Sequence, residues 1–230
     1  MYYGLINSMN KVTAPSYPSS LKLFIDAGNV ASYSGSGTTV TDLIGTQNGT
    51  LINGVGYSAS NGGYLTMNGT NQYIDLSNNT TIRPTAQRTI QGWFYINSGS
   101  GMLYSDGNLN ANLDTVSFWQ DSTNFYTVIG NSSTAQTKTS AKLTNATWVY
   151  VTLRFNGTTI ELYFNDVLQY SIAQTVTPTN TSTIPAKIGT YNGTGYFLNG
   201  SCSMLKIFNE YRSASDMTAD FNLYKSRYGY

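Results

Sequence analysis

The 230-residue sequence contains no histidine, and this absence excludes several kinds of site. A Ser-His-Asp triad, a Cys-His pair and an imidazole metal site all need that side chain. Charged residues are also scarce, at 10% of the chain against about 25% in ordinary soluble domains. With 12 Lys and Arg against 11 Asp and Glu, the net charge is +1, which predicts no nucleic-acid partner because such binding needs clustered basic residues.

Cysteine and long apolar runs are nearly absent as well. The single Cys202 cannot form an internal disulfide, so a disulfide-stabilised secreted scaffold is excluded. We expect Cys202 to be a small buried side chain in a strand. No apolar run approaches the roughly 20 residues of a membrane span, so no membrane partner is expected. The first ten residues lack a basic start and an apolar stretch, and we do not expect a signal peptide.

Carboxylates are too few for the chemistry of glycoside hydrolysis, which needs an acid and a partner carboxylate at a set separation. The chain has two glutamates, Glu161 and Glu210, and nine aspartates, with no Glu-x-Asp-x-x-Glu array. Asp114 and Asp121 would support catalysis only if they faced each other across a cleft. We therefore predict that the protein is not an enzyme and requires no cofactor.

In place of charge the chain has small polar residues: 31 Thr, 25 Ser, 24 Asn and 22 Gly. Asn and Gly tolerate the positive φ that tight hairpin turns require, and the Asn-Gly pairs of the chain include those that begin at positions 48, 53, 68, 156, 192 and 199. Between such turns, short alternating segments predict strands over 89–96, 115–120, 125–129, 187–190 and 203–209. This spacing is typical of an all-β sandwich or barrel.

One hairpin is predicted in detail around the Asn156-Gly157 turn, with strands over 148–155 and 158–165. The pairing places aliphatic partners on one face, namely Leu153 with Ile160, Val151 with Leu162 and Val149 with Phe164. The other face carries polar and tyrosine partners. A slip of one residue would destroy this agreement between the turn and the alternation.

One helix is predicted near the end of the chain. Ser213 is a suitable N-cap, with Asp216 three residues later. Apolar and aromatic residues then recur at helical spacing, at Met217, Phe221, Tyr224 and Tyr228. The sequence therefore predicts a sandwich with a terminal helix packed against it.

Residues 1–20 differ from the rest, with two prolines and a short apolar patch. We predict an extended arm that docks through Tyr2, Tyr3, Leu5 and Ile6, and a disordered tail is the alternative. The sandwich is then expected to occupy residues 21–230.

The run from Trp148 to Asp166 resembles the laminin G-like, concanavalin A-like lectin/glucanase family, in which a Trp-led strand, a short turn and a Leu-Tyr-x-Asn/Asp-Gly strand recur. Asp166 stands where the family usually has glycine. The similarity continues in the opening segment 23–29 and in the closing segment 204–216, and it covers residues 21–230. This pattern as a whole, which ends with residues 224–229, is similar to modules of bacteriophage structural proteins.

The resemblance implies an all-β fold, a jelly-roll sandwich of two antiparallel sheets with a short C-terminal helix. Family members bind carbohydrate, bind protein or serve as structural decoration, so the fold does not decide the function. Some members of the family that the chain resembles hold calcium on the sandwich rim, and Asp26, Asp75 and Asp106 are weak candidates by residue type alone. Turn-capping aspartates are the alternative explanation.

The candidate contact residues lie on the outer face of the predicted hairpin and its neighbours. They are Trp148, Tyr150, Arg154, Glu161 and Tyr163, with Trp119 on a separate strand and Trp93 and Tyr95 as an extension of the face. Aromatic rings beside amides and hydroxyls suit sugars. Tyrosine-rich surfaces also suit protein contact, and the same rings can pack under loops.

From these observations we expect a non-enzymatic virion structural protein, a phage capsid decoration or surface module attached at the virion surface through its N-terminal arm. Its partners would be other capsid or tail proteins, and a second copy of the chain is a further candidate. The alternative is a carbohydrate-binding adhesin that recognises host glycans on the concave sheet.

Overall fold

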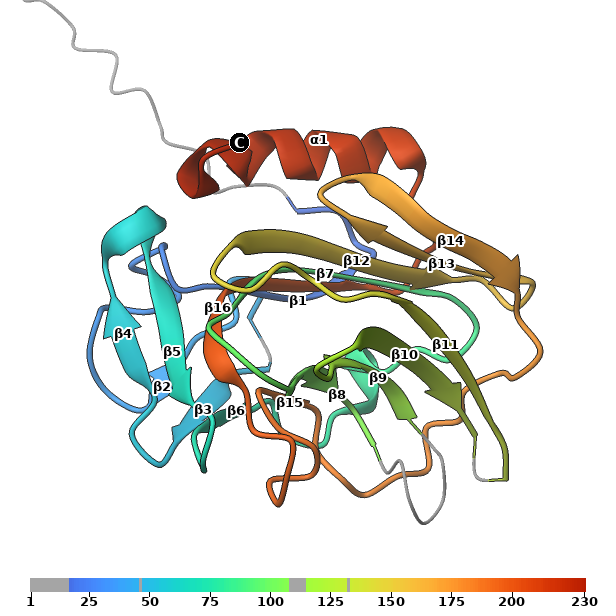
Figure 1. Cartoon of the computed structure of the whole chain (residues 1–230), viewed down its shortest axis with the longest axis horizontal. Helices are drawn as coiled ribbons and strands as arrows, with labels where there is room; N and C mark the ends of the chain where they lie inside the picture. Colours follow the sequence, from blue (N-terminus) through green and yellow to red (C-terminus); the bar gives the residue numbers. More distant parts are fainter. Residues whose placement is uncertain (1–16, 46, 108–114, 132) are drawn as a thin grey trace, which may run out of the picture.

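The computed structural model describes residues 17–45, 47–107, 115–131 and 133–230. This part of the chain forms two eight-stranded antiparallel sheets packed face to face, with the C-terminal helix outside one of them (Figure 1). The predicted β-sandwich with a short terminal helix is thereby confirmed. None of the described helices is long and apolar enough to cross a membrane.

The helix-covered sheet lies under the C-terminal helix. Its strand order is β14 (Val167–Ala173), β13 (Thr159–Phe164), β12 (Trp148–Phe155), β7 (Arg88–Ile96), β16 (Asn199–Phe208), β5 (Tyr64–Asn68) and β4 (Gly56–Ser58). The last part of β16 pairs with β1 (Leu21–Asp26) instead of β5. The long strand β16 thus connects both ends of the chain to this sheet.

The opposite sheet has the order β11 (Ala135–Ala141), β10 (Asn124–Gly130), β9 (Thr115–Gln120), β8 (Gly101–Ser105), β15 (Lys187–Ile188), β6 (Tyr73–Asp75), β3 (Gly49–Ile52) and β2 (Thr39–Val40). The described helices are α1 (Ala214–Tyr224) and the short 3-10 helices η1 (Ser60–Gly62), η2 (Thr80–Ile82) and η3 (Lys225–Tyr228).

The main core fills the space between the sheets with side chains that alternate along each strand. Phe94 and Phe118 meet edge to face across it at 5.9 Å between ring centroids, and Leu153 and Ile207 are fully buried in the same cluster. Cys202 is buried in β16, as predicted, and burial raises the pKa of its thiol. The five strands predicted from alternation are all present within a few residues of their expected ends.

The β12–β13 hairpin corrects the predicted register by two residues. Leu153 lies opposite Leu162 and Val151 opposite Phe164, where Ile160 and Leu162 were expected. The turn centres on Gly157-Thr158, because Gly157 has φ +88° at the position where a type II′ turn needs glycine. A shift of two residues keeps every side chain on its predicted face, so the core assignment holds although the partners were wrong.

Helix α1 begins as predicted. The Ser213 hydroxyl accepts a hydrogen bond from the amide of Asp216 at 3.1 Å and donates one to the Asp216 carboxylate at 2.6 Å. Met217 and Tyr228 are buried, and Phe221 and Tyr224 are partly buried against the sheet. Gly229 has the left-handed conformation, with φ +86°, and ends η3.

Candidate functional site

The outer face of the helix-covered sheet carries its side chains in rows that run across neighbouring strands. One row, which we call the open row, is set by the strand register: Trp148 lies opposite Tyr95, Tyr95 opposite Ser201, and Ser201 opposite Thr66. These four residues come from β12, β7, β16 and β5. Strands far apart in the sequence therefore bring two aromatic rings and two hydroxyls into one line.

The adjacent row, which we call the covered row, consists of Tyr150, Trp93 and Met204. It lies beneath α1 and η3, where the Tyr228 ring stacks on Trp93 at 4.0 Å between centroids and 20° between planes. A β-bulge between Cys202 and Met204 inserts one residue between the two rows on β16. The two rows face the same side of the sheet, and only one of them is covered.

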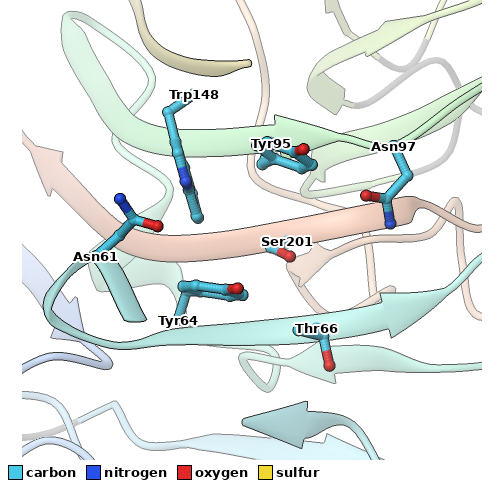
Figure 2. A pocket seen from close by; sticks show the side chains of 7 residues that line it. All are labelled: Asn61, Tyr64, Thr66, Tyr95, Asn97, Trp148 and Ser201. Atoms are coloured by element: carbon cyan, nitrogen blue, oxygen red, sulfur yellow. The ribbon is translucent and has the colours of Figure 1, made fainter. Parts of the chain in front are cut away.

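The open row is the floor of a pocket with a volume of about 270 Å³. Tyr64, two residues before Thr66, and Asn97, just after the end of β7, also line the pocket, and Asn61 of η1 closes one end. The lining residues are Asn61, Tyr64, Thr66, Tyr95, Asn97, Trp148 and Ser201. Figure 2 shows Trp148 and Tyr64 pointing toward each other, with Asn61 at one end and Asn97 and Thr66 at the other.

Three aromatic rings line this pocket, and the Trp148 ring contacts the other two. The Trp148 ring lies 5.1 Å from that of Tyr64 and 5.4 Å from that of Tyr95, both at steep angles. Tyr228 also contacts Trp148, at 5.0 Å, so the end of η3 supports the indole from behind. The rings are held by each other rather than by hydrogen bonds.

The hydroxyls of the pocket differ from its carboxamides in having no hydrogen-bond partner among the described residues. The hydroxyls of Tyr64 and Tyr95 make no hydrogen bond in the part of the chain that the structure describes, and neither do those of Thr66 and Ser201. Asn97 is fixed by a 3.0 Å bond from its amide to the Asn199 side-chain oxygen. The pocket therefore offers several free donors and acceptors beside an aromatic surface.

The wall at Asn61 is built by a left-handed backbone and an arginine. Asn61 has φ 49° and ψ 34°, and its amide donates to the Arg227 carbonyl at 2.9 Å. Arg227 in turn contacts both carboxylate oxygens of Asp26, at 3.0 and 3.1 Å. Gly62 is favoured here because its φ is +70°, and a Cβ at that position would also lie 2.7 Å from the Arg227 Nε.

The predicted contact residues do not form one surface in the structure. Trp148 lines the pocket, but Tyr150 is about 1% exposed beneath α1, which corrects the expectation that it forms a contact surface. Burial raises the pKa of the Tyr150 phenol well above its usual value. Of the two residues that extended the face, Tyr95 reaches the pocket and Trp93 is fully buried.

The structure does bring Arg154, Glu161 and Tyr163 together, but their polar groups form hydrogen bonds with one another. Arg154 Nε donates to Glu161 at 2.7 Å, and the Tyr163 hydroxyl donates to the same carboxylate at 2.8 Å. The Arg154 guanidinium lies 4.1 Å from the Tyr211 ring centroid. Burial raises the pKa of Glu161, but hydrogen bonds from Tyr163, Arg154, Tyr211 and Ser171 outweigh it, so the pKa lies below its usual value.

Trp119 lies on the opposite sheet, half-buried and stacked on Tyr126 at 5.0 Å with 7° between the ring planes. The Tyr126 hydroxyl donates to Asp121 at 2.7 Å. Trp119 is therefore not part of the face that carries Trp148. Asp114 and the arm residues Tyr2, Tyr3, Leu5 and Ile6 lie outside the described residues.

The three calcium candidates are partners of basic side chains. Asp26 pairs with Arg227, Asp75 with Lys187 at 3.3 Å, and Asp106 with Arg88. Asp26 and Asp75 also cap turns, accepting from the amides of Gly28 and Ser77. Among the described residues there is no group of three or more Asp, Glu, His or Cys side chains that could hold a metal ion.

Sequence reasoning missed five lining residues: Asn61, Tyr64, Thr66, Asn97 and Ser201. A signal for two of them was present, since Leu65 and Met67 are core residues and alternation places Tyr64 and Thr66 on the outer face. No local pattern identifies Ser201 or Asn61, because their position depends on the bulge in β16 and on the contact with Arg227.

Comparisons with solved structures show the same fold. The binding domain of botulinum neurotoxin serotype G has a TM-score of 0.70 at 11% identity, covering 88% of this chain and 51% of that one. Botulinum neurotoxin type C, whose cell entry depends on two ganglioside molecules, has a TM-score of 0.64 at 16% identity, covering 89% and 51%. The chain thus spans about half the length of these neurotoxin structures.

A Ruminococcus gnavus sialidase CBM40 bound to α2,3-sialyllactose has a TM-score of 0.59 at 16% identity, covering 69% of this chain and 96% of that one. No curated protein sequence matches the chain. The family model described as the concanavalin A-like lectin/glucanases superfamily matches residues 68–218. Because this match takes in most of the chain, the protein belongs to the concanavalin A-like lectin/glucanases superfamily.

Proposed function

We propose that the protein is a non-catalytic carbohydrate-binding module whose binding site is the pocket over the open row. The observation that carries this proposal is the combination of three aromatic rings with four free hydroxyls in one open pocket. The alternative weighed from the sequence, a carbohydrate-binding adhesin, is thus favoured over virion decoration. Attachment to a virion stays a prediction.

The chemistry of the pocket matches that of a sugar ring. A pyranose has an apolar face of C–H groups that packs on aromatic rings and an edge of hydroxyls that both donate and accept hydrogen bonds. Trp148 and Tyr64 supply the rings, and Thr66 and Ser201 supply small hydroxyls on the floor. The volume of about 270 Å³ is near the lower end of ligand pockets, about 300 Å³, and suits one or two sugar units.

A binding role fits the neighbours in fold. The CBM40 structure holds a sialylated lactose, and the type C neurotoxin depends on gangliosides, so this sandwich serves glycan recognition in other proteins. Catalysis has no comparable support, because the pocket contains no carboxylate that could act as an acid or a base. We therefore infer that binding, without turnover, is the function of the pocket.

The proposal is tested by screening the intact chain on a glycan array and titrating the strongest hit by calorimetry. We expect Tyr64→Ala to weaken binding about tenfold or more, because it removes a ring that faces Trp148 across the pocket. The matched control is Tyr196→Ala, which removes a more exposed tyrosine ring outside the pocket and should leave affinity unchanged.

Thermal unfolding of both variants distinguishes lost binding from lost folding. Tyr64→Ala should unfold within a few degrees of the wild type, because Tyr64 is only partly buried. An array without hits, or a glycan that binds Tyr64→Ala as tightly as the wild type, would contradict the proposed site.

A further inference from the structure

We propose that this pocket selects neutral glycans and discriminates against those whose bound sugar carries a carboxylate, as sialic acid does. The inference rests on the proposed carbohydrate-binding function and names the ligand class of the same pocket. It follows from the charges that line and surround the pocket.

No lining side chain of the pocket is charged. The lining consists of three aromatic rings, two carboxamides and two aliphatic hydroxyls, all from described residues. Two of these groups, Trp148 and Ser201, are less than one tenth exposed, so a ligand that contacts them is largely removed from water. The deepest part of the pocket therefore offers neutral partners only.

The cation that supports the pocket wall is already compensated. Arg227 contacts both oxygens of Asp26 and also donates to the carbonyls of Asn61 and Gly62, at 3.4 and 3.1 Å. Two further cations on this face are compensated in the same way: Lys206 pairs with Asp220 at 2.9 Å and Arg154 pairs with Glu161. None of these three side chains lines the pocket, and each has its own carboxylate.

A carboxylate that enters such a pocket loses its hydration without gaining a cation. Buried anions are stable in proteins when they are paired, and unpaired ones carry a large desolvation penalty. A neutral sugar has no such penalty, because its hydroxyls exchange water for the free hydroxyls of Thr66, Ser201 and the two tyrosines. The absence of an uncompensated cation therefore favours neutral glycans over those that carry a carboxylate.

The experiment compares three forms of one glycan by calorimetry: the best neutral oligosaccharide hit, the same glycan capped with α2,3-linked sialic acid, and the methyl ester of the capped form. We expect the capped glycan to bind at least about tenfold more weakly than the neutral one. The ester has the same size without the charge, and we expect it to recover most of the lost affinity.

A variant with a cation in the pocket tests the same inference from the protein side. Thr66→Lys should reduce the discrimination against the capped glycan severalfold at low salt, and added salt should restore it. The matched control is Thr139→Lys, an exposed position on β11 of the opposite sheet, which should not change the ratio.

The outcomes separate the inference from the function on which it rests. Equal or tighter binding of the capped glycan by the wild type would overturn the inference and leave the proposed function intact. An ester that stays as weak as the free acid would also overturn it, because size would then be the cause. An array on which no glycan binds would overturn the proposed function and this inference together.

Discussion

The covered row and the open row lie side by side on one face of the sheet and both contain aromatic residues, but only the covered row is packed beneath α1 and η3. In the covered row, Trp93 and Tyr150 are buried beneath α1 and η3, and the Trp93 Nε1 and the Tyr150 hydroxyl have no hydrogen-bond partner within the described part of the chain. In the open row, the Tyr95 hydroxyl also lacks a partner among the described residues, but it lies in a pocket. The covered row stabilises the fold, and the open row is available to a ligand.

The difference teaches that aromatic content on a sheet face does not identify a binding site. What decides is where the covering helix ends. Tyr228 marks this boundary, because its ring stacks on Trp93 and also contacts Trp148. The end of η3 therefore covers Trp93 of the covered row and also packs against Trp148 of the open row.

The largest effect is expected from Trp93→Ala in the covered row. Removing this fully buried ring leaves a cavity under Tyr228 and Phe221, and we expect the free energy of unfolding to fall by about 3–5 kcal/mol. Urea denaturation measures this change. Trp119→Ala on the opposite sheet is the control and should cost clearly less, because Trp119 is only partly buried. Equal losses would contradict the structural role of the covered row.

Arg227→Ala acts on the boundary between the two rows. It leaves Asp26 without its ion pair and removes the guanidinium bonds to the Asn61 and Gly62 carbonyls, so we expect a stability loss of about 2 kcal/mol together with a severalfold loss of glycan affinity. Chemical denaturation and calorimetry measure the two effects. The control is Arg212→Ala, which lies outside the pocket and should leave affinity unchanged. Unchanged affinity in Arg227→Ala would show that Asn61 holds its position without the arginine.

Ser213→Ala tests how much the N-cap of α1 contributes to the stability of the helix that packs over the covered row. The substitution removes the N-cap of α1 and should lower the free energy of unfolding by about 1 kcal/mol. Binding at the pocket should not change, because α1 begins at the far end from the pocket wall. Ser213→Thr keeps the capping hydroxyl and serves as the control. A loss of affinity without a loss of stability would contradict this separation.

The smallest effect concerns Glu161, which is on the same face near the start of α1. Because its pKa lies below the usual value in the folded state, its stabilisation is present at neutral pH and is lost as the pH falls below about 4. Glu161→Gln should lower the free energy of unfolding by about 0.5 kcal/mol at pH 7, with a smaller difference at pH 3. Denaturation midpoints at the two pH values measure this, and a difference that grows at low pH would contradict it.

Much of the fold could be predicted from the sequence, because alternation and Asn-Gly turns act locally. The core faces of Val151 and Leu153 and the cap at Ser213 are of this kind. The hairpin register was missed since Gly157 can occupy either central position of a two-residue turn. The edge strand β11, with the sequence AQTKTSA, gave no signal because its side chains are mostly exposed.

The site was less predictable for a related reason. Alternation places Trp93, Tyr95, Trp148 and Tyr150 on one face, but it does not show which of them a helix 60 or more residues later will cover. The separation of the two rows also depends on the bulge after Cys202. Both are tertiary features. They divide the predicted aromatic face into two parts, a packed cluster with Trp93 and Tyr150 and a pocket with Trp148 and Tyr95.

The most direct test uses the three tryptophans of the chain, which occupy three different environments. Trp148 lines the pocket, Trp93 is buried in the covered row, and Trp119 lies on the opposite sheet. Their indole N–H signals in an NMR titration, assigned with single Trp→Phe variants, report on each place separately. We predict that the bound glycan shifts the Trp148 signal and leaves those of Trp93 and Trp119 in place. A shift confined to Trp119 would contradict the assignment of the open row as the binding site.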